Sequence, residues 1–201
     1  MERELQEYII NHLSSVEKCF LDFMEFLSEA KNPEAAEDRI KLLSYNVSRR
    51  ETDADFCLIR ITEKSADTSK EMMIDEFSSL CDSFCNRLED FAKEISSQTS
   101  SVFFDISNMI AELTASVFSL FICLKDAVEL IASLKINEAK MKRKDIQECE
   151  SKLDIKEKEI FSKILLSSAP QDEKMQTMSL VNKISKLPDV IKKASDIINA
   201  M

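Results

Sequence analysis

Residues 41–61 read "KLLSYNVSRRETDADFCLIRI", and the spacing of their apolar side chains predicts an amphipathic α-helix. At about 100° per residue, the apolar residues from position 40 onward fall within roughly 60° of one direction: Ile40, Leu43, Val47, Ala54, Leu58 and Ile61. Glu51 lies about 20° from that direction, on the face that a helix normally turns toward a core, and Asp55 follows one turn later. The stretch therefore predicts a helix with a pair of carboxylates beside its buried face.

Around this helix, the composition predicts an all-α protein. The 201 residues contain no glycine, whereas average usage near 7% would give about fourteen. Glycine supplies the positive φ angles of tight hairpins and of many helix ends, so its absence disfavours β-hairpins. It also excludes glycine-rich phosphate loops and nucleophile elbows. With His12 as the single histidine, catalytic triads are excluded too, and we do not expect an enzyme.

The charge and the cysteines indicate the environment and the class of partner. The chain carries 37 acidic and 27 basic residues, a net charge of −10, which argues against binding to nucleic acid. Its six cysteines form no Cys-x-x-Cys pair, and such scattered thiols are typical of a reducing compartment. The chain opens without a signal-peptide pattern, and its longest apolar run, residues 113–124, is too short to span a bilayer. We therefore expect a cytoplasmic protein.

Apolar periodicity predicts six helical stretches, at about 2–30, 33–64, 70–96, 102–135, 138–166 and 173–200. The second is expected to begin at Pro33, with Asn32 as its N-cap. Long helices joined by short loops pack as antiparallel neighbours. The sequence thus predicts six long antiparallel helices in two tandem three-helix bundles, 1–98 and 99–201, within one continuous domain.

The two halves repeat the acidic pair. "ETDAD" (51–55) has a counterpart in "ESKLD" (150–154), so that Glu51 and Asp55 are matched by Glu150 and Asp154 at a distance of 99 residues. An apolar stripe flanks the second pair as well: Ile146, Leu153, Ile160 and Ile164. The same placement in both halves indicates an internal duplication that retained the pair.

Carboxylates four residues apart on one helix face repel each other and are costly to bury. Nearby arginines and lysines could balance them, and from the spacing alone this interpretation is favoured over a metal ion. The duplication favours a metal, and oxygen ligands suit hard cations such as Mg²⁺, Mn²⁺, Ca²⁺ or iron. His12 is expected to be an ordinary surface or boundary residue.

In order and spacing, the sequence resembles the PhoU-like phosphate transport regulators, and most closely the branch associated with inorganic phosphate transporters. The stretches that carry the resemblance are "RRETDADFCLIRITEKS…MIDEFSSLCDSFCNRLEDFAKEI" and "ECESKLDIKEKEIFSKILLSS…SLVNKISKLPDVIKKASDII". In that family an acidic motif on the third helix of each bundle completes a metal site, and its last position falls here on Glu89 and Asp189. The motif's other acidic position is Cys85 or Ser185, and Asp82 and Asn86 are candidate replacements in the first half.

The resemblance implies a metal-binding regulator of phosphate transport. The implied ligands are Glu51, Asp55 and Glu89 in the first half and Glu150, Asp154 and Asp189 in the second. It also implies a protein that docks on a phosphate transporter or its signalling partner, reaches the membrane only through that partner, and forms homo-oligomers. The alternative is a metal-free helical scaffold or adaptor.

Overall fold

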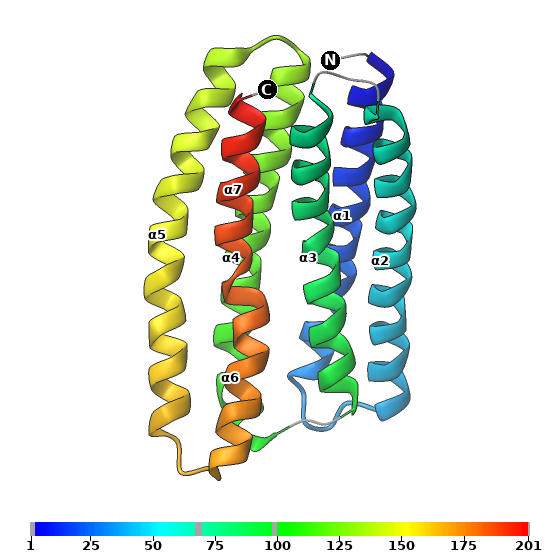
Figure 1. Cartoon of the computed structure of the whole chain (residues 1–201). Helices are drawn as coiled ribbons and strands as arrows, with labels where there is room; N and C mark the ends of the chain where they lie inside the picture. The colour runs from blue at the N-terminus through cyan, green and yellow to red at the C-terminus, as the bar shows by residue number, and fades with distance from the viewer. Residues whose placement is uncertain (1–2, 67–69, 98–99, 201) are drawn as a thin grey trace.

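The structure of the chain is all-α, as predicted. The computed structural model describes residues 3–66, 70–97 and 100–200, and every regular element within these ranges is a helix (Figure 1). The helices are α1 (Arg3–Ala30), α2 (Glu37–Ser65), α3 (Glu71–Ser97), α4 (Ser101–Ala132), α5 (Ile136–Leu166), α6 (Gln171–Ser185) and α7 (Leu187–Ala200). The predicted boundary between two bundles, at residues 98 and 99, lies outside the described residues, so this division stays a prediction.

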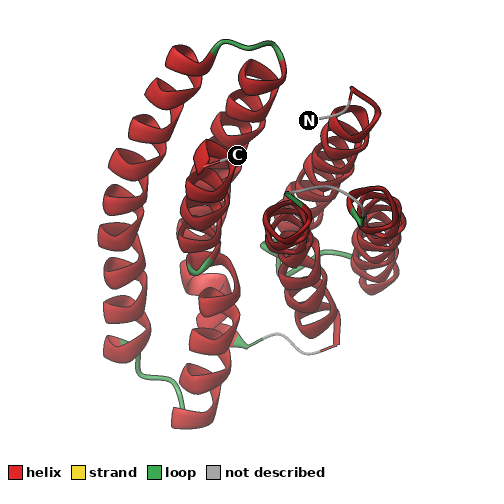
Figure 2. Ribbon diagram, turned by 45° about the horizontal axis from the view of Figure 1, so that its top comes forward, coloured by secondary structure: helices red, strands yellow, loops and turns green. Residues whose placement is uncertain are grey.

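The helices run up and down the molecule and are joined by short connections (Figure 1), and Figure 2 shows that α1, α2 and α3 are inclined to α4 to α7. Helices α1, α2 and α3 lie on one side, and α4 to α7 on the other (Figure 1). Contacts of α1 with α4, and of α3 with α6 and α7, join the two sides. Helices α2 and α5, which carry the acidic pairs, form the two opposite edges of the molecule.

The last predicted helix is divided into α6 and α7. The first ends at Ser185, the second begins at Leu187, and Pro188 follows immediately. Proline has no backbone N–H, and its ring clashes with the carbonyl group four residues earlier, so a continuous helix cannot pass through it undisturbed. The two helices follow one another in a single column (Figure 1).

The start of α2 differs from the prediction. The helix begins at Glu37 rather than at Pro33. The Asn32 side chain accepts a hydrogen bond from the backbone N–H of Glu34, at 3.1 Å, and so closes a turn two residues long. Asn32 therefore forms a turn before the helix instead of capping it.

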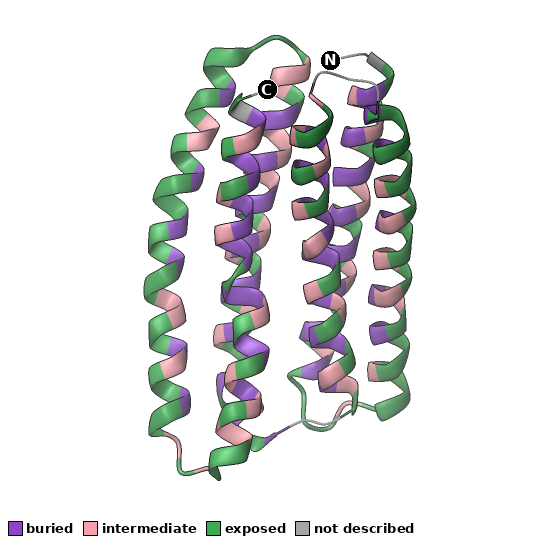
Figure 3. Ribbon diagram, viewed as in Figure 1, coloured by how far each residue is buried: buried purple, intermediate pink, exposed green. Residues whose placement is uncertain are grey.

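One apolar core runs through both sides of the molecule. Buried side chains line the inner faces of the helices, whereas α2 and α5 expose their outer faces (Figure 3). The Phe20 ring on α1 stacks on Phe121 of α4 at a centroid distance of 5.3 Å, and Phe84 of α3 meets Phe121 edge-on at 5.7 Å. Among the described residues, no helix has both the length and the hydropathy needed to cross a membrane.

Candidate functional site

Four carboxylates from two helices form what we call the first acidic cluster: Glu51 and Asp55 on α2, and Asp82 and Glu89 on α3. Asp82 is buried, with 7% of its surface exposed, and Glu51 and Asp55 are half-buried. The Glu89 side chain is only 13% exposed. Helical spacing puts the first two on one face of α2, and packing of α2 against α3 brings the other two to them.

The charges of this cluster act on one another. Burial raises the pKa of Glu51 above its ordinary value, and the neighbouring charges of Asp55 and Glu89 raise it further. A carboxyl group responds in this way when like charges surround it and no cation balances them fully. Glu51, Asp55 and Glu89, the three residues predicted for the first half, therefore share one electrostatic environment.

Asp82 is the most perturbed member of the cluster. Burial, followed by the charge and hydrogen bonding of Asp55 and the charge of Glu51, raises its pKa to about 7. The Asn86 side-chain amide donates to Asp82 Oδ2 at 2.9 Å. No donor among the described residues reaches Asp82 Oδ1. A proton or a cation at this oxygen would relieve the repulsion.

Only one ion pair balances the first acidic cluster within the described part of the chain. Lys93, one turn beyond Glu89, places its Nζ atom 2.5 Å from Glu89 Oε1. Arg50, next to Glu51 in sequence, instead pairs with Asp22 on α1 at 2.8 Å. Among the described residues, none of the three nearby arginines, Arg49, Arg50 and Arg60, forms a salt bridge with Glu51 or Asp55, contrary to the ion-pair interpretation of the spacing.

His12 is buried beside this cluster, and the expectation of a surface or boundary position was wrong. Its side chain is fully buried, and Nδ1 donates to the backbone carbonyl of Ala54 on α2 at 3.2 Å. Burial lowers its pKa, which favours the neutral ring. The spacing contained the signal, because position 12 lies three residues after Ile9 and four before Val16, on the apolar stripe of α1.

The second acidic group, which consists of Glu150, Asp154 and Asp189, has a different balance of charge. Glu150 on α5 is buried, and its Oε1 atom accepts a hydrogen bond from Lys192 Nζ of α7 at 3.0 Å. This hydrogen bond, and then the charge of Glu150, raise the pKa of Lys192. Asp189 is half-buried one turn before Lys192, whereas Asp154 is exposed on α5. A lysine therefore supplies the positive charge that Glu150 needs.

The two acidic groups differ in whether their residues could hold a metal ion. Within residues 3–66, 70–97 and 100–200, no three His, Cys, Asp or Glu side chains are arranged so that they could hold a metal ion. The first acidic cluster still fits a hard cation by its chemistry, because its donors are carboxylate oxygens and Asp82 Oδ1 has no donor. The second group does not fit, since Lys192 already pairs with Glu150.

The fold matches solved structures, although the sequence matches little. No protein-family model and no curated protein matches the sequence. A structure from Shewanella oneidensis MR-1, described as a PhoU-like phosphate regulatory protein, superposes with a TM-score of 0.85 over 98% of both chains. A second PhoU-like protein from the same organism gives a TM-score of 0.82, again over 98% of both chains. The sequence identities are 10% and 11%.

These matches confirm the resemblance at the level of the fold. They cover nearly the whole chain in both directions, so no large part of either neighbour lacks a counterpart here. The similarity of fold carries no information about individual side chains at such identities. The role of the two acidic groups depends on the geometry described above.

Proposed function

We propose that this protein is a PhoU-like regulator of phosphate transport. The proposal is supported by one observation above all, the match of fold over 98% of the chain to a protein described as a PhoU-like phosphate regulatory protein. A regulator acts through surfaces and charge rather than through reacting groups. The long helices, the exposed edges α2 and α5 and the net charge of −10 suit such a role.

In this proposal the protein docks on a phosphate transporter or on its signalling partner. The chain needs no membrane-spanning helix of its own for this, because the partner brings it to the membrane. Large apolar side chains exposed on other helices, such as Met72 on α3 and Met175 on α6, provide contact area for docking. A helical scaffold without any link to phosphate is the alternative.

We further propose that the first acidic cluster holds one hard cation. Glu51, Asp55 and Glu89 would hold it, with Asp82 Oδ1 as a further donor, and these side chains would have to move toward one another to do so, because they are not arranged as a metal site in the structure. The cation would supply positive charge, and α2 and α3 would then be held together where their carboxylates otherwise repel. The proposal does not extend to Glu150, Asp154 and Asp189, because Lys192 already balances Glu150. Metal binding by these three residues stays a prediction from the resemblance.

Phosphate uptake in cells tests the main proposal. Deletion of the gene in its own host is expected to change the uptake of radiolabelled phosphate in phosphate-rich medium, and the wild-type gene should restore it. Sulfate uptake serves as the matched control and should not change. Unaltered phosphate uptake and phosphate content after deletion would favour the scaffold alternative.

Thermal unfolding of the purified protein tests the metal proposal separately. The wild-type Tm is expected to rise when Mg²⁺, Mn²⁺, Ca²⁺ or ferric iron is added, because a ligand that binds only the folded state stabilises it. The Glu51→Gln/Asp55→Asn variant should lose most of this rise. A control with the same loss of charge, Asp105→Asn/Glu112→Gln on the exposed face of α4, should retain it. Equal responses of both variants would contradict the proposal.

A further inference from the structure

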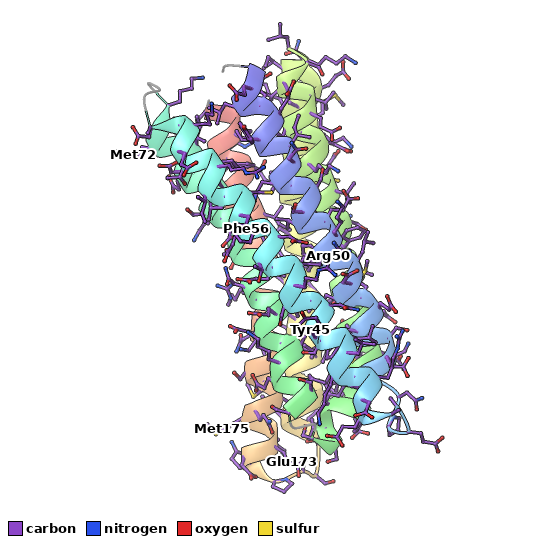
Figure 4. The ribbon with its side chains drawn as sticks, turned by 90° about the vertical axis from the view of Figure 1, so that its right-hand side faces the viewer. Tyr45, Arg50, Phe56, Met72, Glu173 and Met175 are labelled. Carbon is purple, nitrogen blue, oxygen red and sulfur yellow. The ribbon has the colours of Figure 1, made fainter. Side chains whose placement is uncertain are left out.

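The outer face of α2 carries exposed apolar and charged side chains. Leu42, Tyr45 and Phe56 are 50%, 66% and 63% exposed, and Tyr45 and Phe56 lie along the outer side of α2 in Figure 4. At about 100° per residue, they share one face with further exposed residues. We call this face the α2 stripe: Leu42, Tyr45, Arg49, Asp53, Phe56, Arg60 and Glu63.

Helix α5 has a matching exposed face, 99 residues later in the sequence. The interval of 99 residues that relates Glu51 to Glu150 also relates Leu42 to Met141 and Phe56 to Ile155. Met141 and Ile155 are 68% and 59% exposed. We call this face the α5 stripe: Met141, Lys144, Glu148, Lys152, Ile155, Glu159 and Ser162, all of them exposed.

The two stripes keep their apolar positions but exchange the signs of their charges. Three equivalent positions are charged in both stripes, and the sign is inverted at each: Arg49 with Glu148, Asp53 with Lys152, and Arg60 with Glu159. A duplicated solvated surface needs no such inversion. Two surfaces that bind each other do need it, because opposite charges at facing positions select the partner and like charges exclude others.

Asp53 pairs with Arg50 on the same helix at 3.5 Å, and the other charges of the two stripes are available for an intermolecular contact. Among the described residues, no salt bridge joins Arg49, Arg60, Glu148 or Glu159 to a neighbour. Helices α2 and α5 form opposite edges of the molecule, so the two stripes cannot meet within one chain (Figure 1). Contact between them requires two molecules.

We propose that the α2 stripe of one molecule binds the α5 stripe of a second copy of this chain. When the two helices lie parallel and in register, each of the three charges lies opposite its counterpart of the other sign. Leu42 and Phe56 then lie opposite the partner's Met141 and Ile155. Tyr45 lies opposite the partner's Lys144, which permits a cation–π contact. The inference is independent of the proposed role in phosphate transport.

The contact is heterologous, because it joins two different faces. A pair leaves an α5 stripe free on one molecule and an α2 stripe free on the other, so further copies can add until a ring closes or a chain grows. A single helix packed along a single helix, about 45 Å in length, makes a small interface. We therefore expect reversible association that depends on protein concentration and weakens as salt rises.

Analytical ultracentrifugation of two charge-reversal variants tests the proposal. Arg49→Glu/Arg60→Glu makes the two stripes of a molecule both acidic at these positions, and Glu148→Arg/Glu159→Arg makes both basic. Each variant alone should associate at least tenfold more weakly than the wild type. An equimolar mixture should associate again, because every contact between the two variants restores opposite charges.

Control variants carry the same changes of charge at exposed sites elsewhere. Lys18→Glu/Lys193→Glu and Glu34→Arg/Glu112→Arg should leave association unchanged. A wild type that stays monomeric at high concentration would overturn the proposal. Loss of association in only one reversal variant would also overturn it, because this would indicate contact between identical faces. A mixture of the two variants that fails to associate would overturn it as well.

Discussion

At the scale of residues, the two halves differ in how their buried carboxylates are balanced: Asp82 lies among other carboxylates, whereas Glu150 pairs with Lys192. The spacing predicted that Glu51 and Asp55 would share a face, and Glu89, which the resemblance implied, lies in their electrostatic environment. The depth of Asp82 and the pairing of Lys192 with Glu150 were beyond prediction. Helical periodicity gives the direction of a side chain, whereas depth and pairing depend on which helix lies opposite.

Asp82 predicts how the stability of the protein depends on pH. Its pKa is about 7 in the folded state and near 3.8 ordinarily, so the folded chain binds more protons than the unfolded chain between these values. The free energy of unfolding should therefore fall as pH rises from about 4 to 7 on account of this residue. The neutral Asp82→Asn variant should remove this fall and unfold at a Tm several degrees above the wild type at pH 8.

Thermal unfolding from pH 4 to 8 measures this effect, with the exposed Asp105→Asn as the control. His12 acts in the opposite sense, since its lowered pKa costs stability as pH falls below about 6.5. The comparison of Asp82→Asn with the wild type cancels that contribution. If the Tm values of Asp82→Asn and of the wild type changed with pH in parallel, ionisation of Asp82 would have no effect on the stability of the folded state.

Lys192 predicts an asymmetric response to mutation. Lys192→Met leaves Glu150 buried without its cation, and such an unpaired charge destabilises the folded state. We expect a Tm lower by a few degrees, partly restored in Lys192→Met/Glu150→Gln, where neither charge remains. Lys193→Met, at an exposed neighbour, is the control. An effect of Lys193→Met as large as that of Lys192→Met would contradict a specific pair.

At the scale of elements, the absence of glycine and the apolar periodicity were enough to predict the helices and their order. The errors lie at helix ends, where one local bond decides the outcome. Asn32 closes a turn instead of a cap, and Pro188 divides the last helix. In both places several local structures were compatible with the sequence, and the surrounding chain selected one.

The turn between α4 and α5 shows the cost of having no glycine. Leu134 adopts a φ angle of 61°, in the left-handed region, and its side chain is 84% exposed. This conformation costs a residue with a Cβ atom about 1 kcal/mol, and glycine is the usual choice at such a helix end. Leu134→Gly should therefore raise the free energy of unfolding by up to about 1 kcal/mol.

Urea unfolding of Leu134→Gly and of Ser133→Gly measures this contribution. Ser133 is adjacent but has a φ angle of −88°, so glycine relieves no strain there and only adds freedom to the unfolded chain. Ser133→Gly should be neutral or destabilising. If both variants lost stability equally, the left-handed conformation of Leu134 would carry no measurable strain.

At the scale of the whole molecule, the aromatic side chains join the two halves into one core. Phe121 on α4 contacts Phe20 and Phe84, which belong to α1 and α3. The sequence could not show that the core crosses from one half to the other. A shared core predicts that the two halves unfold together, although each repeats the same order of helices.

Phe121→Ala tests this cooperativity. Removal of a fully buried phenylalanine should cost about 3 to 5 kcal/mol, because a cavity is left where rings from both halves meet. Chemical denaturation, followed by circular dichroism and by near-ultraviolet absorbance, should still show one coincident transition at a lower midpoint. Phe56→Ala, at a ring that is 63% exposed, should change stability by less than about 0.5 kcal/mol. Two separate transitions in either the wild type or Phe121→Ala would mean that the halves fold independently and that the rings merely touch.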